Sequence, residues 1–283
     1  MRTPLTYYGG KQQLAPVILP MIPEHRLYCE PFLGGGAIFF AKSPSQAEVI
    51  NDTNRELINF YEVVQRDYVE LEKHIQISLH SRDLHRKATV IYENPDMFDK
   101  VRRAWAVWVL AAESFGAMLN GSYGYDLTGS TAIKTRNKRD SFSLDYAVRL
   151  QDVEIECADA LRIIRSRDSA ETFFYCDPPY INTDCGHYDG YTIEDYEMLL
   201  KLLSSIEGKF LLSSFPNQLL EEYVTNKGWT MQKIEMRMSV NAKSENRKAT
   251  KTEVLVGNYG LCANQPDLFL QLDNDIYPTD KHE

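Results

Sequence analysis

A short apolar run that ends in Asp-Pro-Pro-Tyr is the feature that most constrains the fold of this chain. Residues 172–176 (TFFYC) are followed directly by Asp177, Pro178, Pro179 and Tyr180. A run of this length without alternation is typical of a strand that is buried on both faces of a parallel sheet. Two successive prolines fix φ and remove two N–H donors, so the strand must end there. The sequence therefore predicts a stiff loop at the carboxyl end of a central strand, where α/β sheets bind ligands.

This loop presents hydrogen-bond acceptors. They are the Asp177 carboxylate and the carbonyl oxygens of Asp177 and Pro178, which suit a group that donates two hydrogens, such as an aromatic amine. Tyr180 adds a flat ring on which a base could stack, worth about 1–3 kcal/mol. We therefore assign Asp177, Pro178, Pro179 and Tyr180 as candidate catalytic residues. The structural alternative is a strand that ends in a proline turn with a surface tyrosine.

Strand-like and helix-like segments alternate on both sides of a central insert. Residues 26–29 and 48–50 read as short strands, and a glycine turn with a helix lies between them. The alternation resumes after residue 151, with further strands expected at 210–213 and 253–256. This order predicts an α/β fold, namely a doubly wound, Rossmann-like sheet with helices on both faces.

The insert has a different character. We expect helices at 68–80 and 101–119, whereas residues 121–142 are rich in Gly, Ser, Thr and charge and predict loops with a hairpin. The expected domains are a catalytic unit formed by 1–66 and 151–260, a smaller helical and loop lobe formed by 67–150, and an acidic tail at 261–283.

Composition excludes several classes of protein. The five cysteines form no CxxC pair, which argues against a disulfide scaffold or a structural zinc site and favours a reducing compartment. The longest apolar run has nine residues, Ala104 to Ala112, and the N-terminus carries no apolar secretory segment. We expect a cytoplasmic protein without a membrane span or a metal. The net charge of −9 argues mildly against nucleic-acid binding, so local charge has to be considered.

Four segments, taken together, resemble the Dam-like family of DNA adenine N6-methyltransferases, which use S-adenosyl-L-methionine. Tyr7-Tyr-Gly-Gly-Lys11 is similar to the N-terminal motif of that family, and Glu30-Pro-Phe-Leu-Gly-Gly-Gly36 is similar to its EPF-x-G-x-G motif. Asn51-Asp-Thr-Asn54 is similar to its D-x-N segment, and Asp177-Pro-Pro-Tyr180 is similar to its catalytic DPPY motif. The four occur in the family order. Tyr7 stands where many relatives have Trp.

The resemblance implies a binding site for S-adenosyl-L-methionine as the cofactor. Tyr7 and Lys11 would contact its methionine end, Gly34 and its neighbours would let the backbone approach it, and Asp52 would accept hydrogen bonds from its ribose. The aromatic residue that usually follows the acid at Asp159 is absent. The alternatives are a solvated Lys11, a helix-start glycine cluster and an N-cap role for Asp52. The expected cofactor-binding residues are Tyr7, Lys11, Glu30, Phe32, Gly34, Gly36, Asp52, Asp159 and Asp177.

The resemblance also implies the reaction. The target adenine would flip out of double-stranded DNA, stack on Tyr180 and donate its amine hydrogens to Asp177 and Pro178, while the amine nitrogen attacks the sulfonium methyl directly.

Local charge favours DNA as the partner. Residues 100–150 hold eight basic against four acidic side chains, and residues 233–251 hold six against two. In the family, the insert before DPPY carries target recognition, and a cognate restriction endonuclease is a further expected partner. For each residue the alternative is an ordinary solvated loop position. The expected DNA-binding residues are Asn120, Tyr123, Tyr125, Lys134, Arg136, Lys138 and Arg139.

Two other functions remain open. An RNA or protein-glutamine methyltransferase would also hold an amine in an acceptor cradle, but such relatives more often carry Asn in place of Asp177. A non-catalytic DNA-binding subunit could keep the fold, although the intact Asp177 and glycine motif argue against it.

Overall fold

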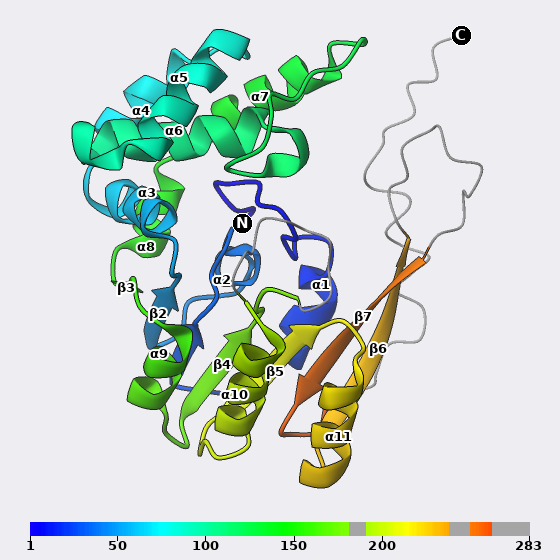
Figure 1. The fold of residues 1–283 in the computed structure, drawn as a ribbon. Helices are drawn as coiled ribbons and strands as arrows, with labels where there is room; N and C mark the ends of the chain where they lie inside the picture. The colour runs from blue at the N-terminus through cyan, green and yellow to red at the C-terminus, as the bar shows by residue number, and fades with distance from the viewer. Residues whose placement is uncertain (181–190, 238–249, 262–283) are drawn as a thin grey trace, which may run out of the picture.

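The computed structural model of the protein describes residues 1–180, 191–237 and 250–261. Within these ranges a seven-stranded sheet has the order β3-β2-β1-β4-β5-β7-β6 (Figure 1). The five strands β3, β2, β1, β4 and β5, which are neighbours in this order, are parallel. Strand β7 runs antiparallel to both β5 and β6. The strands are β1 (Leu27–Glu30), β2 (Ala47–Asn51), β3 (Glu154–Glu156), β4 (Thr172–Cys176), β5 (Lys209–Ser214), β6 (Thr230–Arg237) and β7 (Thr250–Gly257).

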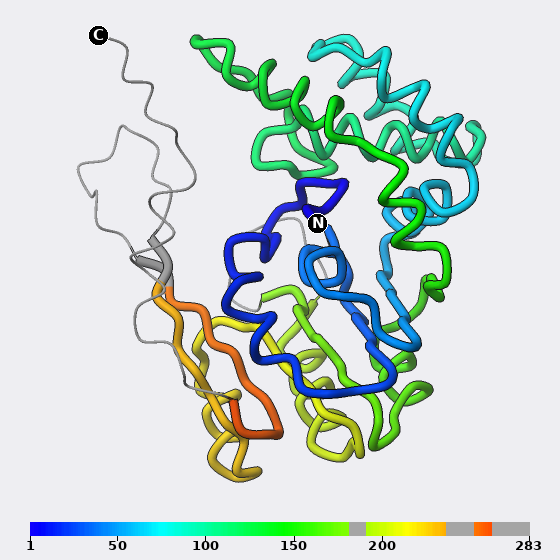
Figure 2. The backbone as a smooth tube through the Cα atoms, turned by 180° about the vertical axis from the view of Figure 1, so that it is seen from behind, coloured from blue at the N-terminus to red at the C-terminus, as the bar shows by residue number. Residues whose placement is uncertain are grey.

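Helices cover both faces of this sheet. Side chains alternate along β4 between the two faces. Phe173 and Tyr175 pack into the core on the face covered by α1, α2 and α3, and Phe174 and Cys176 pack into the core on the face covered by α9, α10 and α11. Figure 2, seen from behind, shows the N-terminal segment and α1 in front of the sheet, whereas α10 and α11 lie in front in Figure 1. The predicted fold class is therefore confirmed. The helices on one face are α1 (Ala15–Ile18), α2 (Ala37–Ala41) and α3 (Arg55–Arg66), and those on the other are α9 (Ala160–Arg167), α10 (Ile193–Leu203) and α11 (Gln218–Lys227).

A helical lobe lies beyond the carboxyl end of β4 (Figure 1). Trp108 of α6 is buried in it, so this tryptophan belongs to the core. No helix in the described part of the chain is long and apolar enough to cross a membrane. The lobe helices are α4 (Tyr68–Gln76), α5 (Arg82–Glu93), α6 (Lys100–Glu113) and α7 (Ser130–Asp140), with α8 (Asp145–Leu150) leading back to the sheet; short 3₁₀ turns cover Leu19–Met21, Pro95–Met97 and Phe115–Ala117.

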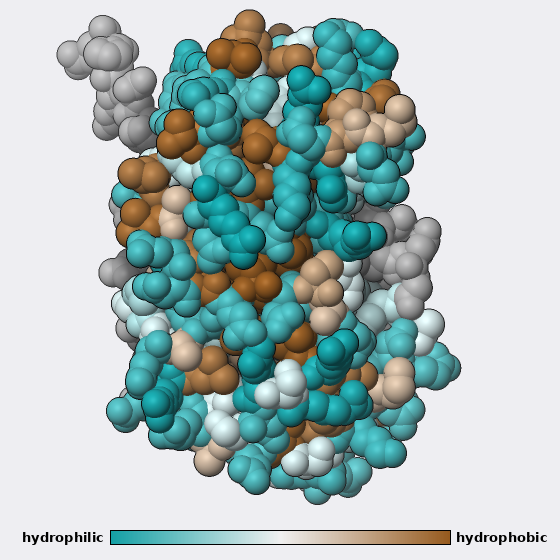
Figure 3. Space-filling view, turned by 90° about the vertical axis from the view of Figure 1, so that its left-hand side faces the viewer, coloured by the Kyte–Doolittle hydropathy of each residue, from teal (hydrophilic) through white to brown (hydrophobic). Residues whose placement is uncertain are grey.

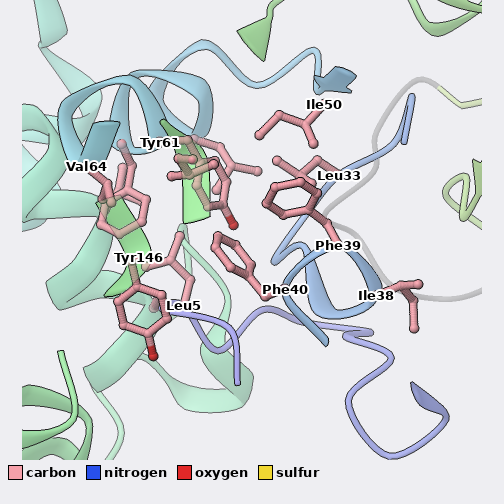
Figure 4. Close-up of a cluster of buried hydrophobic side chains, with 14 of the residues drawn as sticks. Leu5, Leu33, Ile38, Phe39, Phe40, Ile50, Tyr61, Val64 and Tyr146 are labelled. Atoms are coloured by element: carbon pink, nitrogen blue, oxygen red, sulfur yellow. The ribbon is translucent and has the colours of Figure 1, made fainter. Parts of the chain in front are cut away.

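The core that joins the lobe to the sheet is aromatic. Figure 4 shows Phe39, Phe40, Tyr61 and Tyr146 meeting there, beside Leu5 of the N-terminal segment. The ring of Phe40 lies edge-on to that of Tyr146, with the centroids 5.8 Å apart, and 6.0 Å from that of Tyr61. Because Phe40 lies one turn after the glycine loop, this packing also fixes the position of that loop. Outside, the face that carries α3, α8 and α9 is mostly hydrophilic, with hydrophobic side chains in separated groups (Figure 3).

One expectation about secondary structure is wrong. Residues 130–140 form the helix α7, not loops and a hairpin. The Asp126 carboxylate accepts hydrogen bonds from the N–H groups of Thr128, Ser130 and Thr131, and so satisfies donors at the start of this helix. The helix has little apolar periodicity, and Thr135 is its one buried residue, so the sequence pattern does not show it.

Candidate active site

A pocket of about 560 Å³ opens at the carboxyl ends of β1, β4 and β5. This volume lies within the range of pockets that bind small molecules, about 300–1,000 Å³. Residues from all four sequence motifs line the pocket, so the fold brings the predicted segments together. Those predicted as cofactor-binding or catalytic that line it are Tyr7, Lys11, Glu30, Phe32, Gly34, Gly36, Asp52, Asp159, Asp177, Pro178, Pro179 and Tyr180.

Lys11, the last residue of the N-terminal motif, binds the loop of residues 177–180. The Lys11 Nζ lies 2.8 Å from Oδ1 of Asp177 and donates to the Gly9 carbonyl at 3.1 Å. Lys11 is 7% exposed, so the alternative of a solvated surface charge is wrong. Burial raises the pKa of Asp177, and the nearby Lys11 ammonium opposes this rise. The ammonium thus occupies one of the acceptor positions that the sequence assigned to a substrate amine.

Tyr180 contacts neighbours through both its ring and its hydroxyl. Its ring packs at 4.3 Å from the Phe215 ring, with an angle of 60° between the planes, and the Lys11 Nζ lies 4.8 Å from its centroid. Its hydroxyl lies 3.1 Å from Asp177 Oδ1 and 3.1 Å from Ser213 Oγ, and it donates to Glu253. The hydroxyl end of the ring is therefore tied into a polar cluster.

Glu30 is a carboxyl group buried at the floor of the pocket. It is 2% exposed and accepts a hydrogen bond from the Tyr28 hydroxyl at 2.7 Å. Burial raises the pKa of Glu30 to about 8, although the hydrogen bond from Tyr28 opposes the rise. The group is therefore largely protonated at neutral pH while the pocket is free.

The glycine loop after β1 makes room for Tyr7. A Cβ on Gly35 would lie 2.8 Å from Cβ of Tyr7, and one on Gly34 would lie 3.2 Å from its ring. Gly34 and Gly36 both have positive φ, +50° and +66°, which favours glycine at these positions. The close approach that requires glycine in the structure is thus that of Tyr7, which in turn lines the pocket.

Asp52 ties the end of β2 to this glycine loop. Its Oδ2 accepts from the Gly34 N–H and its Oδ1 from the Asn54 N–H, each at 2.9 Å. The N-cap of α3 is Asn54, which accepts from the N–H groups of Glu56 and Leu57, so the alternative N-cap role of Asp52 is wrong. Burial raises the pKa of Asp52. Asp159, at the other side of the pocket, is the N-cap of α9 and accepts from the Arg162 N–H at 3.0 Å.

Several residues of the site were not predicted. Glu253 of β7 has a side chain that is 1% exposed, and its Oε1 accepts from Ser213 of β5 at 2.8 Å and lies 3.5 Å from Lys11 Nζ. Tyr175, Tyr191 and Phe215 also line the pocket. A glutamate at the start of the apolar strand at 253–256 was the available signal, because an acid seldom enters a buried strand without a partner.

Three buried polar atoms at the pocket have no hydrogen-bond partner among the described residues. They are Glu253 Oε2 and the hydroxyl oxygens of Tyr175 and Tyr191. Buried polar groups are normally paired, so unpaired atoms in one pocket indicate a ligand with donors and acceptors of its own. In the described part of the chain, the pocket included, no group of three or more His, Cys, Asp or Glu side chains is arranged to bind a metal ion.

The predicted DNA-binding residues fall into two groups. Asn120, Tyr125, Lys134 and Arg136 are exposed. In contrast, the Lys138 ammonium donates to the carbonyl of Ala111 at 3.3 Å, and burial lowers its pKa to about 8. Arg139 donates to the Ser78 carbonyl at 3.3 Å and pairs with Asp140 at 3.0 Å. The last two side chains are therefore engaged within the lobe.

Tyr123 belongs to an aromatic and cationic cluster on the lobe. Its ring stacks on His80 with the centroids 4.8 Å apart and lies nearly parallel to the ring of Tyr125 at 6.5 Å. The Arg82 guanidinium lies 4.8 Å from the Tyr123 centroid and 5.4 Å from that of Tyr125. Most of the second basic segment, at 233–251, and the acidic tail except Leu261 lie outside the described residues.

Comparison with known proteins decides the family. Residues 7–247 match the family of D12 class N6 adenine-specific DNA methyltransferases. The chain belongs to this family. The predicted resemblance and the predicted enzyme class, DNA adenine N6-methylation with a donor of the S-adenosylmethionine type, are thereby confirmed.

Curated relatives of this D12 class enzyme cover most of its length. Type II methyltransferase M1.LlaDCHI of Lactococcus lactis subsp. cremoris is 29% identical, over 89% of this chain and 93% of the relative. The DNA N-6-adenine-methyltransferase of Escherichia phage P1 is 27% identical, over 87% of this chain and 34% of the relative. The DNA adenine methylase of Escherichia coli K12 is 24% identical, over 90% of this chain and 94% of the relative.

Proposed function

We propose that this D12 class enzyme transfers the methyl group of S-adenosyl-L-methionine to a flipped adenine of double-stranded DNA through the residues of the pocket described above. The observation that carries the proposal is the acceptor-lined end of the pocket, where Asp177 and Pro178 follow the buried strand β4 and meet Lys11. An exocyclic amine has two hydrogens to donate, which is the complement of these acceptors.

The residues present fit the donor. Tyr7, the glycine loop and Asp52 line one side of the pocket and Asp159 with Tyr191 another, and Glu30, Asp177 and Glu253 place three carboxyl groups where a cation would be favoured. We assign Glu30 to the ammonium of the donor and Asp52 to its ribose hydroxyls. When bound, S-adenosyl-L-methionine supplies a methyl group that is activated by a sulfonium.

The chain then acts by positioning the amine. Tyr180 offers its ring to the flipped base, and Asp177 with the Pro178 carbonyl accepts the two amine hydrogens, which orients the nitrogen toward the methyl group. Lys11 must shift part of its hydrogen bonding from Asp177 as the amine arrives, and Glu253 is already 3.5 Å away to receive it. The catalytic gain comes from orientation and from fixed electrostatics.

A plasmid assay tests the proposal directly. Purified enzyme, unmethylated plasmid and S-adenosyl-L-methionine should yield N6-methyladenine at one defined sequence, mapped by sequencing. Methyl groups found on RNA or on a protein glutamine, with none on the plasmid, would refute it. A cognate restriction endonuclease, the other expected partner, should cut the mapped sequence only in the unmethylated plasmid.

The assignment of Glu30 predicts that donor binding releases a proton. The pKa of Glu30 is about 8 in the free pocket, so the group is mainly protonated at neutral pH, and an adjacent ammonium favours its ionised form. Affinity for the donor should therefore rise with pH by up to about tenfold per unit and level off above the free pKa. Calorimetry at neutral pH in two buffers of different ionisation enthalpy measures the proton. Glu30→Gln should abolish the buffer dependence, and heats that are independent of the buffer in the native enzyme would contradict the assignment.

We further propose that the lobe formed by residues 67–150 carries the DNA contacts. It lies beyond the carboxyl ends of β1 and β4 (Figure 1), and the residues that follow these two strands line the pocket. Two exposed cations of the lobe, Lys134 and Arg136, lie on α7 and are not held by the internal contacts that engage Lys138 and Arg139. Asn120, Tyr123 and Tyr125 precede the same helix and offer polar and aromatic contacts to base edges.

Lys134→Ala and Arg136→Ala should each weaken DNA binding and reduce the slope of log Kd against log salt by about one, because each removes one phosphate contact. Fluorescence anisotropy at several salt concentrations measures this slope. Lys209→Ala is the matched control, since this exposed lysine begins β5 at the opposite end of the strand from the pocket. An unchanged slope in both α7 variants would separate this helix from the DNA.

A further inference from the structure

The polar cluster around Tyr180 contains more hydrogen-bond contacts than hydroxyl hydrogens. Among the described residues, the Tyr180 oxygen lies next to three oxygens, those of Asp177 (3.1 Å), Ser213 (3.1 Å) and Glu253. Ser213 in turn lies 2.8 Å from the Glu253 carboxylate. These four oxygen–oxygen contacts share one hydrogen from Tyr180 and one from Ser213. The cluster can therefore take up a further proton, which would supply the hydrogen for one more of these oxygen–oxygen contacts.

We propose that Glu253 is the terminal acceptor of the proton that leaves the target amine, and that the Tyr180 hydroxyl passes this proton on from Asp177. The proposal rests on the proposed function, because it takes the amine to be held by Asp177. In this proposal Glu253 positions Tyr180 and accepts the proton through it, and Glu253 itself does not contact the base.

The step balances as follows. The nitrogen lone pair forms the new N–C bond, the C–S bond of the donor breaks, and its electron pair stays on sulfur. The amine nitrogen gives one hydrogen, as a proton, to Asp177 Oδ1. Asp177 donates to the Tyr180 oxygen as the Tyr180 hydrogen moves to Glu253 Oε1, so Asp177 and Tyr180 end as they began and Glu253 holds the proton. It later leaves to water as the products are released.

The charges of the pocket favour this destination. Before transfer the donor carries a sulfonium charge, and Lys11 stands between two carboxylates, Asp177 at 2.8 Å and Glu253 at 3.5 Å. After transfer the sulfur is neutral and one of the carboxylates is protonated, so the net charge of the pocket does not change. In a buried site an uncompensated charge is costly, and a proton retained within the cluster avoids it.

Glu253 lies in buried surroundings at the end of the cluster. The Glu253 side chain is 1% exposed, and its Oε2 has no partner among the described residues. The strand register pairs it with the apolar Ile234 of β6. Within the described ranges, the titratable groups that face this end of the pocket are Lys11, Glu30, Tyr175, Asp177 and Tyr180. Of the carboxyl groups among them, Glu30 is engaged with Tyr28 and is mainly protonated at neutral pH.

Single-turnover methyl transfer tests the proposal. With tritiated S-adenosyl-L-methionine and unmethylated plasmid, Glu253→Gln should slow transfer about 10²-fold, the usual contribution of a general base, while the Kd values for donor and DNA stay within about twofold. The remaining rate should increase with pH up to about tenfold per unit, because hydroxide must now take the proton. Glu235→Gln, an exposed glutamate on the adjacent strand β6, is the matched control and should keep the native rate.

A double-mutant cycle separates this path from a general structural role. Tyr180→Phe keeps the ring and removes the relay, so it should slow transfer to a similar extent, and the double variant should be no slower than either single one. A Glu253→Gln rate within threefold of native, multiplicative effects in the double variant, or an unchanged pH profile would each overturn the relay.

A second readout does not depend on turnover. In free enzyme labelled with carbon-13 at the glutamate carboxyl carbons, the NMR resonance that disappears in Glu253→Gln should change its chemical shift in both Tyr180→Phe and Asp177→Asn, because the three side chains share hydrogen bonds. A chemical shift that neither variant changes would refute the coupling. If the native enzyme placed no methyl group on DNA, the proposed function would fail; if only the Glu253 variants behaved as native, the relay alone would fail.

Discussion

Asp177→Ala should abolish methyl transfer, with a loss of at least about 10³-fold in the single-turnover rate. The substitution removes the acceptor that orients the amine and also the start of the polar cluster that includes Tyr180. The fold should persist, because Lys11 keeps two of its partners, the Gly9 carbonyl and the Glu253 carboxylate. The rate is measured with tritiated donor on plasmid DNA, and the unfolding midpoint by circular dichroism.

Two further variants sharpen this experiment. Asp177→Asn keeps one acceptor oxygen but loses the charge that pairs with Lys11, so it should transfer at an intermediate rate. Asp152→Ala, an exposed acid in the turn before β3, is the control and should match the native enzyme. If Asp177→Ala transferred methyl groups at the native rate, the acceptor mechanism would be wrong. An Asp177→Ala protein that failed to fold would instead show that the Lys11 pair is structural.

The sequence predicted the part of the site that lies within contiguous segments. The buried strand β4 with its proline loop, the glycine loop after β1 and the acid after β2 each carry their signal in a few adjacent residues. Parallel strands bring their carboxyl ends to one edge, so the three segments had to meet once the sheet was assumed. The same reasoning gave the fold class.

Long-range partners could not be predicted in this way. Glu253 contacts Tyr180 and Ser213, which are 73 and 40 residues away in the chain. The pairing of β4 with β5 and of β5 with β7 brings the three together. Helix α7 was missed for a related reason, since its cap, Asp126, lies before the helix in a loop of irregular structure. The Glu253 contacts join side chains, and the Asp126 contacts join a side chain to backbone N–H groups. Local periodicity reveals neither kind of contact.

A second buried cluster, away from the pocket, should dominate the stability of the sheet edge. Glu48 of β2 has a side chain that is 4% exposed and lies between two cations, Lys42 at 2.5 Å and Arg149 at 2.9 Å. Lys42 and Arg149 are similarly buried, and Arg149 also lies 3.8 Å from the centroid of the Phe39 ring. This cluster joins α8, and with it the return from the lobe, to β2.

Glu48→Ala should therefore lower the free energy of unfolding by about 3–5 kcal/mol, because it leaves two buried cations without an anion. Urea denaturation measures this loss. Glu171→Ala is the control, since its ion pair with Arg26 is exposed and should contribute less than about 1 kcal/mol. A loss of the same small size in Glu48→Ala would show that water reaches the cluster and replaces the carboxylate.

The same cluster should appear in the pH dependence of stability. Burial alone would raise the pKa of Glu48, but the hydrogen bonds from Arg149 and Lys42 outweigh burial and lower it. A carboxyl group with a lowered pKa in the folded state stabilises the fold above its unfolded pKa, and this contribution is lost as pH falls through the folded value. Native stability should thus decline in acid more steeply than that of Glu48→Gln, whose amide cannot titrate. Parallel curves for the two proteins, measured by urea denaturation from neutral to acidic pH, would mean that Glu48 is not the group that couples protonation to the packing of α8 on β2.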